Sequence, residues 1–123
     1  MLIWDDTTFM ASNQSGERVL IASVAFERVL TNGLFAEHFE AKRWAAYYPY
    51  SEANKCLLLK TGPYFNFSKP DCPFGYNATI NALSGEAFWT PSDSSVEFRI
   101  LWNKKEIGRC QIAQKRCEIW FPA

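Results

Sequence analysis

Apolar and polar residues alternate most regularly between residues 95 and 102, in the stretch SVEFRILW. Glu97 and Arg99 fall on one face of an extended chain, and the apolar residues that share the other face are Val96, Phe98, Ile100 and Trp102. Because successive side chains of a strand point to opposite faces of a sheet, this pattern predicts a half-buried β-strand. The polar run 103–105 then predicts a turn.

A second alternating stretch, 108–121, carries Cys110 and Cys117 among isoleucines. A two-residue turn at 114–115 makes this stretch a hairpin in which each cysteine faces an isoleucine. The cysteines are then diagonal neighbours, about 7–8 Å apart at Cα, which is too far for an unstrained disulfide. A turn one residue earlier places them directly opposite each other and permits the bond.

Strand signals also occupy most of the middle of the chain. Apolar, β-branched and aromatic residues predict extended segments at 55–61, 64–68, 75–83 and 86–90. Gly62 and Pro63 separate the first two segments, and the prolines of KPDCPFG indicate a loop before the third. Ser84 and Gly85 predict the tip of a hairpin between the last two.

The N-terminal third predicts a hairpin followed by a short helix. Strand-like residues 9–12 and 17–23 flank the turn NQSG, where Gly16 can adopt positive φ without a Cβ clash. Ser23 then stands where a helix N-cap would lie, and 24–31 predicts a helix closed by the pair Asn-Gly that follows. A strand that continues through VLIASVAF is the alternative.

Residues 34–48 show the clearest helical spacing in the chain. Phe35, Phe39 and Ala46 lie along one stripe, and the residues opposite them are Glu37, Glu40 and Arg43. This spacing predicts an amphipathic helix that ends at Pro49.

Together these elements predict a single α+β domain over 1–123. We expect a mostly antiparallel, twisted sheet of five or six strands, with the two N-terminal-half helices packed on one face. The other face stays in water or forms a dimer surface, and its residues are Glu97, Arg99, Gln111, Glu118 and Trp120. The short edge strand CEIWF, ended by Pro122, is a second candidate surface for self-association.

Charge and hydropathy exclude several partners. Lys plus Arg and Asp plus Glu are balanced at 13 each, so no net field attracts nucleic acid or an anionic membrane surface. The longest apolar runs are far shorter than the roughly 20 residues that a membrane span needs. The N-terminus MLIWDDTTFM lacks the basic and apolar regions of a signal peptide, which predicts a cytoplasmic protein.

The four cysteines do not have the spacing of a metal site. Zinc knuckles place two cysteines with two to four residues between them, whereas here no such pair exists and the chain has one histidine. We therefore expect no metal and no cofactor. Buried free thiols are the preferred prediction, and a disulfide between Cys110 and Cys117, or between Cys56 and Cys72, is the alternative.

The aromatic share of 16% is the most informative feature of the composition. Residues close to the end of the predicted long helix cannot all point inward, since consecutive helical positions span most of its circumference. We therefore predict a contact surface for a protein partner or a small apolar or aromatic ligand, made of Trp44, Tyr47, Tyr48, Tyr50, Tyr64 and Trp120.

Three functions are compatible with these residues. The first is a small binding or interaction module, acting as a monomer or homodimer, that presents an aromatic-rich surface or cleft. The second is a small-molecule-binding protein or enzyme whose pocket lies between helix 34–48 and the sheet, with Trp44, Tyr48 and Tyr64 in its wall and His38 as its titratable group. The third is a carbohydrate-binding domain. No nucleophile, phosphate-loop or metalloprotease motif is present, so catalysis is not expected.

Overall fold

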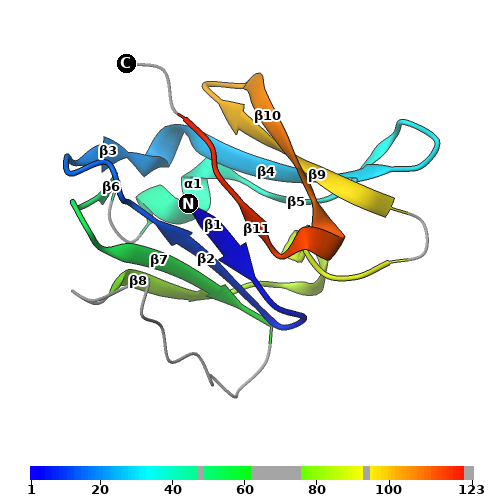
Figure 1. Ribbon diagram of the computed structural model, residues 1–123, viewed down its shortest axis with the longest axis horizontal. Coiled ribbons are helices and arrows are strands. Elements are labelled where there is room, and N and C mark those ends of the chain that lie inside the picture. The colour runs from blue at the N-terminus through cyan, green and yellow to red at the C-terminus, as the bar shows by residue number, and fades with distance from the viewer. Residues whose placement is uncertain (47–48, 62–75, 93–94, 121–123) are drawn as a thin grey trace.

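Nine of the strands pair into two sheets that face each other across a shared core (Figure 1). The computed structural model describes residues 1–46, 49–61, 76–92 and 95–120. The larger sheet has the order β11-β1-β2-β7-β8, and its strands are β1 (Leu2–Trp4), β2 (Thr8–Ser12), β7 (Cys56–Lys60), β8 (Tyr76–Asn81) and β11 (Arg116–Cys117). All its pairs are antiparallel except β7 with β8, which run parallel.

The second sheet is antiparallel throughout. Its order is β10-β9-β4-β5, and its strands are β4 (Val24–Leu30), β5 (Phe35–Phe39), β9 (Ser95–Trp102) and β10 (Lys105–Gln111). Asn103 and Lys104 join β9 to β10 with φ of 49° and 68°, the left-handed values that a tight hairpin turn requires. The predicted strand at 95–102, its turn and the mostly antiparallel pairing are therefore confirmed.

The remaining elements are short. Strands β3 (Val19–Leu20) and β6 (Tyr50–Ser51) pair with each other. Within the described ranges, helix is limited to α1 (Ala41–Ala45) and three 3-10 turns, η1 (Ile21–Ser23), η2 (Ser84–Glu86) and η3 (Ile112–Gln114). The α+β prediction with two helices on one sheet is therefore wrong, and the fold is mostly β.

Phenylalanine rings fill the space between the two sheets. Phe26 stacks on Phe88 with ring centroids 4.7 Å apart. Phe9 and Phe98 meet Phe88 edge-on at 4.8 and 5.0 Å. All four rings are fully buried. Burying each ring contributes about 1.5–3 kcal/mol relative to leaving it exposed, so this cluster is a major source of stability.

Strand β7 is buried on both of its faces. Leu57 and Leu59 belong to the core between the sheets, whereas Cys56 and Leu58 pack with Met10 on the opposite side of the larger sheet. This explains the unbroken apolar run CLLL, because a strand covered on both sides has no polar face. The predicted strand at 55–61 is confirmed as β7, and that at 64–68 lies outside the described residues.

Residues 24–31 form strand β4 instead of the predicted helix. Val24 and Phe26 enter the core, and Ala25 and Glu27 alternate with them. β4 also pairs with β9 along its whole length, which gives these β-branched and aromatic residues the flat packing surface that they favour. The alternative of a continuous strand through VLIASVAF is half correct, since η1 interrupts it.

The predicted helix 34–48 is also wrong. Residues 35–39 form β5, which pairs with β4, and only Ala41–Ala45 are helical. The pair Asn32 and Gly33 forms the β4–β5 turn, with Gly33 at φ 86°, instead of capping a helix. These residues form a strand because pairing with β4 satisfies their backbone hydrogen bonds. The spacing of apolar residues within the segment contains no information about that distant partner.

Two predicted hairpins are absent. Strand β2 pairs with β1 and β7, and β3 pairs with β6, so residues 9–12 and 17–23 are not partners. Gly16 nevertheless has the expected positive φ, 79°. β8 continues into η2, and the following Phe88 and Trp89 are buried in the core without joining a strand.

Arg28 of β4 binds the segment 87–90, which follows η2, to the four-stranded sheet. Its side chain is only 4% exposed and projects from β4 toward the core face. The guanidinium donates to the backbone oxygens of Ala87 and Thr90, each at 2.7 Å, and to the Ser95 hydroxyl at 2.8 Å. Nε lies 2.8 Å from a carboxylate oxygen of Glu37, out of line for a hydrogen bond, so that contact is an ion pair.

Candidate functional site

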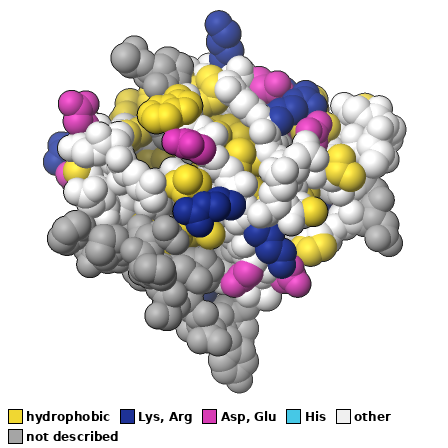
Figure 2. Space-filling view, viewed as in Figure 1, with side chains coloured by type: hydrophobic (Ala, Val, Ile, Leu, Met, Phe, Trp, Pro, Cys, Tyr) yellow, Lys and Arg dark blue, Asp and Glu magenta, His cyan; other side chains and the backbone are white. Residues whose placement is uncertain are grey.

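A cleft of about 540 Å³ opens at one end of the sandwich. Leu2 and Phe26, which come from opposite sheets and are buried, lie at its inner end. Trp102, Ile119 and Trp120 add further apolar lining. Figure 2 shows hydrophobic side chains gathered around a hollow at the upper left of the face in view. The cleft therefore connects solvent to the edge of the inter-sheet core.

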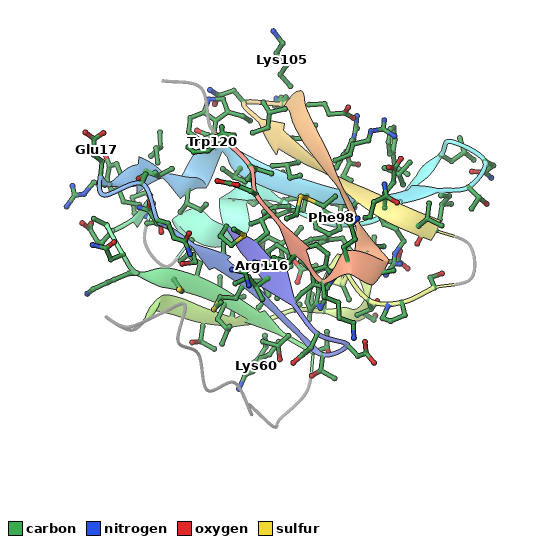
Figure 3. All side chains as sticks on the ribbon, viewed as in Figure 1. Glu17, Lys60, Phe98, Lys105, Arg116 and Trp120 are labelled. Carbon is green, nitrogen blue, oxygen red and sulfur yellow. A yellow bond between two sulfur atoms is a disulfide. The ribbon has the colours of Figure 1, made fainter. Side chains whose placement is uncertain are left out.

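The C-terminal segment 118–120 forms one side of this cleft. Glu118, Ile119 and Trp120 follow β11 and line the cleft without pairing in a sheet. The Trp120 side chain is 79% exposed, and Figure 3 places it at the same end of the molecule as Glu17 on the opposite rim. An indole in this position offers a flat apolar surface to a ligand at the cleft mouth.

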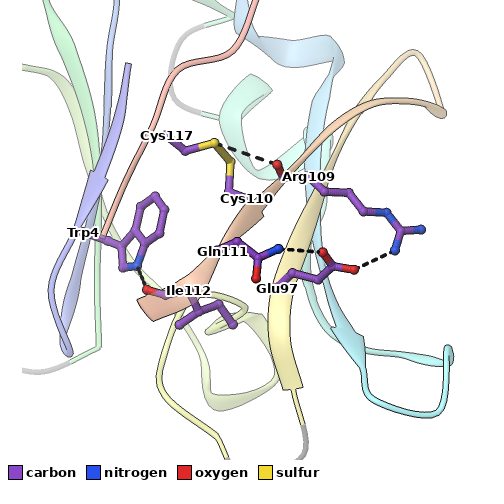
Figure 4. Close-up of a disulfide and its surroundings, with 7 residues drawn as sticks. All are labelled: Trp4, Glu97, Arg109, Cys110, Gln111, Ile112 and Cys117. Carbon is purple, nitrogen blue, oxygen red and sulfur yellow. Dashed lines mark hydrogen bonds and ion pairs between the residues drawn. A yellow bond between two sulfur atoms is a disulfide. The ribbon is translucent and has the colours of Figure 1, made fainter. Parts of the chain in front are cut away.

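A disulfide fixes the start of that segment (Figure 4). It joins Cys110 in β10 to Cys117 in β11, with the Cα atoms 5.8 Å apart, and so links the two sheets. Cys56 is also disulfide-bonded, and the described part of the chain holds no free cysteine. The prediction of free thiols is wrong. Cys72, the other member of the second predicted pair, lies outside the described residues.

Neither predicted hairpin register for 108–121 occurs. η3 and then Lys115, which has a left-handed φ of 59°, turn the chain from one sheet to the other. β11 consequently pairs with β1, where Cys117 lies opposite Leu2. The Trp4 indole N–H donates to the Ile112 backbone oxygen at 2.9 Å and holds η3 against β1 (Figure 4).

The opposite rim is a loop organised by Asn13. Its side-chain amide donates to the backbone oxygens of Glu17 at 2.7 Å and Ser51 at 2.8 Å, and its oxygen accepts from the Ser15 hydroxyl at 2.7 Å. These bonds hold the loop 13–18 against β6. The polar side of the cleft is therefore positioned by one buried asparagine, a role that local sequence pattern did not indicate.

The cations at the cleft already have partners. Arg18 pairs with Glu52 at 2.9 Å, and its guanidinium lies over the Tyr50 ring, 4.7 Å from the centroid. The amino group of Met1 donates to the Ser12 backbone oxygen at 2.9 Å, and burial lowers its pKa below the ordinary value of 8.0. Tyr50, one of the predicted contact residues, thus supports the rim through Arg18.

The other predicted aromatic contacts stay predictions. Tyr47, Tyr48 and Tyr64 lie outside the described residues, as does the side chain of Trp44 in α1. Of the two predicted contact residues whose side chains the structure describes, Tyr50 and Trp120, Trp120 lines the cleft and Tyr50 does not. Phe26, Ser51 and Trp102 were not singled out from the sequence, because they come from three separate strands that only the fold brings together.

His38 does not lie in the helix and pocket wall that were predicted for it. It belongs to β5, its side chain is 50% exposed, and Nε2 lies 3.2 Å from the Glu40 carboxylate. Hydrogen bonds from Lys42 and then from His38 lower the pKa of Glu40. The helix that was to form one wall of a His38 pocket is absent, and His38 is not among the described residues that line the cleft.

The predicted polar sheet face is split between two places. Glu118 and Trp120 line the cleft, whereas Glu97, Arg99 and Gln111 lie on the outer side of the four-stranded sheet. There the polar side chains pair with one another across strands: Arg99 forms an ion pair with Glu27 at 2.6 Å, and the Gln111 amide donates a hydrogen bond to Glu97 at 3.0 Å. The ion pairs on this face thus join residues of the face itself.

The same outer face should make stability depend on pH. Hydrogen bonds from Arg109 and Arg99 hold the pKa of Glu106 below its ordinary value of 4.5, the Arg109 bond contributing most. The ionised carboxylate therefore stabilises the folded state above that ordinary value, and the effect is lost as the pH falls through the lower folded-state pKa.

We expect Glu106→Gln to lower the free energy of unfolding at neutral pH by less than about 1 kcal/mol, because the pair is exposed. The deficit should shrink as the medium is acidified, which urea unfolding at a series of pH values would measure. A deficit that is equally large in acid would contradict this assignment.

No three His, Cys, Asp or Glu side chains within the described ranges lie close enough together to hold a metal ion. Likewise, none of the described helices has the length and apolar character to cross a membrane. No protein-family model matches the chain, and no curated protein matches it significantly.

Proposed function

We propose that the protein is a small binding module that holds a small apolar or aromatic molecule in the cleft between its two sheets. The observation that supports this most directly is that the cleft reaches the core residues Leu2 and Phe26 and is not a flat patch. Its volume of about 540 Å³ falls within the roughly 300–1,000 Å³ of small-molecule sites. Apolar lining of this kind binds by removing ligand surface from water.

The disulfide bonds favour an oxidising compartment as the place where the protein folds. Cys56, Cys110 and Cys117 are all bonded, and such bonds persist mainly outside the cytosol. We therefore propose an extracytoplasmic or luminal location in place of the cytoplasmic one predicted from the N-terminus.

Self-association through the cleft mouth is the second candidate function. Trp120 is exposed, and Leu20, which also lines the cleft, is 41% exposed. Two copies that bury these side chains against each other would form a homodimer. A ligand and a second copy would then compete for the same apolar lining.

Replacing Trp120 with alanine separates these functions from folding. Because the side chain is largely exposed, we expect an unchanged melting temperature. Loss of one aromatic contact worth about 0.5–1.5 kcal/mol should weaken binding of the probe naphthalene about two- to tenfold. Titration calorimetry measures the affinity, and light scattering at several concentrations measures any dimer.

Val96→Ala is the matched control, since Val96 is 59% exposed and does not line the cleft. Wild-type protein that shows no saturable naphthalene binding would overturn the ligand function. A dimer that is lost in Trp120→Ala, together with absent probe binding, would establish self-association in its place.

A further inference from the structure

The accessible apolar surface of the cleft comes from three side chains. Trp120 is 79% exposed, Leu20 is 41% exposed and Trp102 is half-buried. All three line the cleft, so a molecule that enters from solvent can touch them. The face of an indole ring carries negative charge density and attracts a cation placed over it. These side chains can therefore hold a positively charged group as well as an apolar body.

Two exposed glutamates line the same cleft. Glu17 lies in the loop 13–18 on one rim, and Glu118 lies in the segment 118–120 on the other. Figure 2 shows acidic side chains beside the hydrophobic ones at this end of the molecule, where Figure 3 labels Glu17 and Trp120. Neither carboxylate forms an ion pair with a described residue. Both negative charges are therefore available to a molecule in the cleft.

The positive groups of the lining do not balance these carboxylates. Arg18 is paired with Glu52 at 2.9 Å. The Met1 amino group donates to a backbone oxygen at 2.9 Å. Burial lowers the pKa of this amino group, Glu118 opposes the shift, and Arg116, which does not line the cleft, adds to it. A smaller share of it is therefore charged near neutral pH than of an ordinary amino terminus, and the cleft favours cations over anions.

We infer that the cleft prefers an arylalkylamine in its ammonium form to neutral or anionic molecules with the same ring system. The ring lies against the accessible side chains of Leu20, Trp102 and Trp120. The ammonium group lies on the side of the Glu17 and Glu118 carboxylates. This inference rests on the proposed function and specifies its ligand class. Every side chain that it invokes is exposed or half-buried, so each one can act on a molecule in the open cleft.

Three probes with the same ring system test it by titration calorimetry at neutral pH: naphthalene, 2-naphthylmethylammonium and 2-naphthoate. On wild-type protein the ammonium probe should bind about two- to tenfold more tightly than naphthalene, the range expected for an exposed cation–π contact together with a partly screened charge attraction. The carboxylate 2-naphthoate should bind most weakly, because the glutamates repel it. Added sodium chloride should reduce the advantage of the ammonium probe, since salt screens exposed charges.

The double variant Glu17→Gln with Glu118→Gln keeps the shape of both side chains and removes their charges. It should melt at the wild-type temperature, because both residues are exposed, and it should bind naphthalene as wild type does. It should lose most of the preference for the ammonium probe. Glu40→Gln with Glu106→Gln is the matched control, which removes two carboxylates that do not line the cleft and should keep that preference.

The outcomes separate this inference from the proposed function. If naphthalene shows no saturable binding to wild-type protein, the proposed function itself fails. If naphthalene binds but the ammonium probe binds no more tightly, the ligand function stands and the preference for a cation is overturned. A double variant at Glu17 and Glu118 that retains the full preference would likewise overturn the assignment to these carboxylates.

Discussion

Replacing Arg28 with methionine is expected to lower the free energy of unfolding by about 3–5 kcal/mol. Methionine fills a similar volume but donates no hydrogen bonds. The backbone oxygens of Ala87 and Thr90 and the Ser95 hydroxyl would then lose the donor that the guanidinium supplies. Because these groups hold the segment after η2 beside Phe88, the loss should spread to the core.

Urea unfolding followed by circular dichroism measures this effect, and Arg109→Met is the matched control. Both changes remove one positive charge from the same sheet, but Arg109 lies on the exposed outer face. We expect the control to leave the unfolding midpoint almost unchanged. Arg28→Lys should recover only part of the lost stability, since one ammonium cannot reproduce the planar set of donors. Equal losses of stability in Arg28→Met and Arg109→Met would show that the burial of Arg28 does not determine its contribution to stability.

Removing the inter-sheet disulfide, with Cys110→Ala and Cys117→Ala together, is expected to cost about 2–3 kcal/mol. The bond closes a short loop in sequence, but it joins strands of different sheets. In the unfolded chain it restricts the ends of that loop, and in the folded protein it anchors β11. Alanine avoids placing a hydroxyl at the buried position of Cys110.

The same variant should bind naphthalene less tightly, because segment 118–120 begins directly after Cys117. Repeating both measurements in reductant is the control. There the wild type loses the crosslink too, so its stability should approach that of the variant, and the remaining difference reports side-chain packing alone. Alkylation of denatured, unreduced protein should leave both cysteines unmodified. Full alkylation of Cys110 and Cys117 would show that the bond does not form.

The strand at 95–102 was predictable because its information is local. Phe98 and Ile100 face the core and Glu97 faces outward, so the period of two is visible in the residues themselves. The same holds for β7, whose apolar run reports burial on both faces. In both cases a single element carries its own signature, whatever its neighbours are.

The helix predicted at 34–48 was wrong because the structure of this segment depends on its partner strand. Phe35 and Phe39 are four residues apart, which matches helical spacing as well as two positions on one side of a strand. Phe39 enters the core, whereas Phe35 lies outside beneath Arg99, whose guanidinium is 3.7 Å from the ring centroid. A shift of register between β4 and β5 allows this change of side. Apolar spacing within the segment contains no sign of it.

The sequence by itself determined the balance of charge and the strands whose pattern is local, such as β7 and β9, since alternation, apolar runs and charge balance are properties of single segments or of the whole composition. Only the tertiary structure decided that β11 pairs with β1 and not with β10, so that the disulfide between Cys110 and Cys117 joins two sheets and not two strands of a hairpin. It also decided the cleft, whose lining residues Leu2, Phe26, Ser51 and Trp120 are brought together from the two ends and the middle of the chain. Backbone pairing between distant strands depends on satisfying hydrogen bonds across the whole sheet, and no local pattern of side chains specifies which distant strand will supply them.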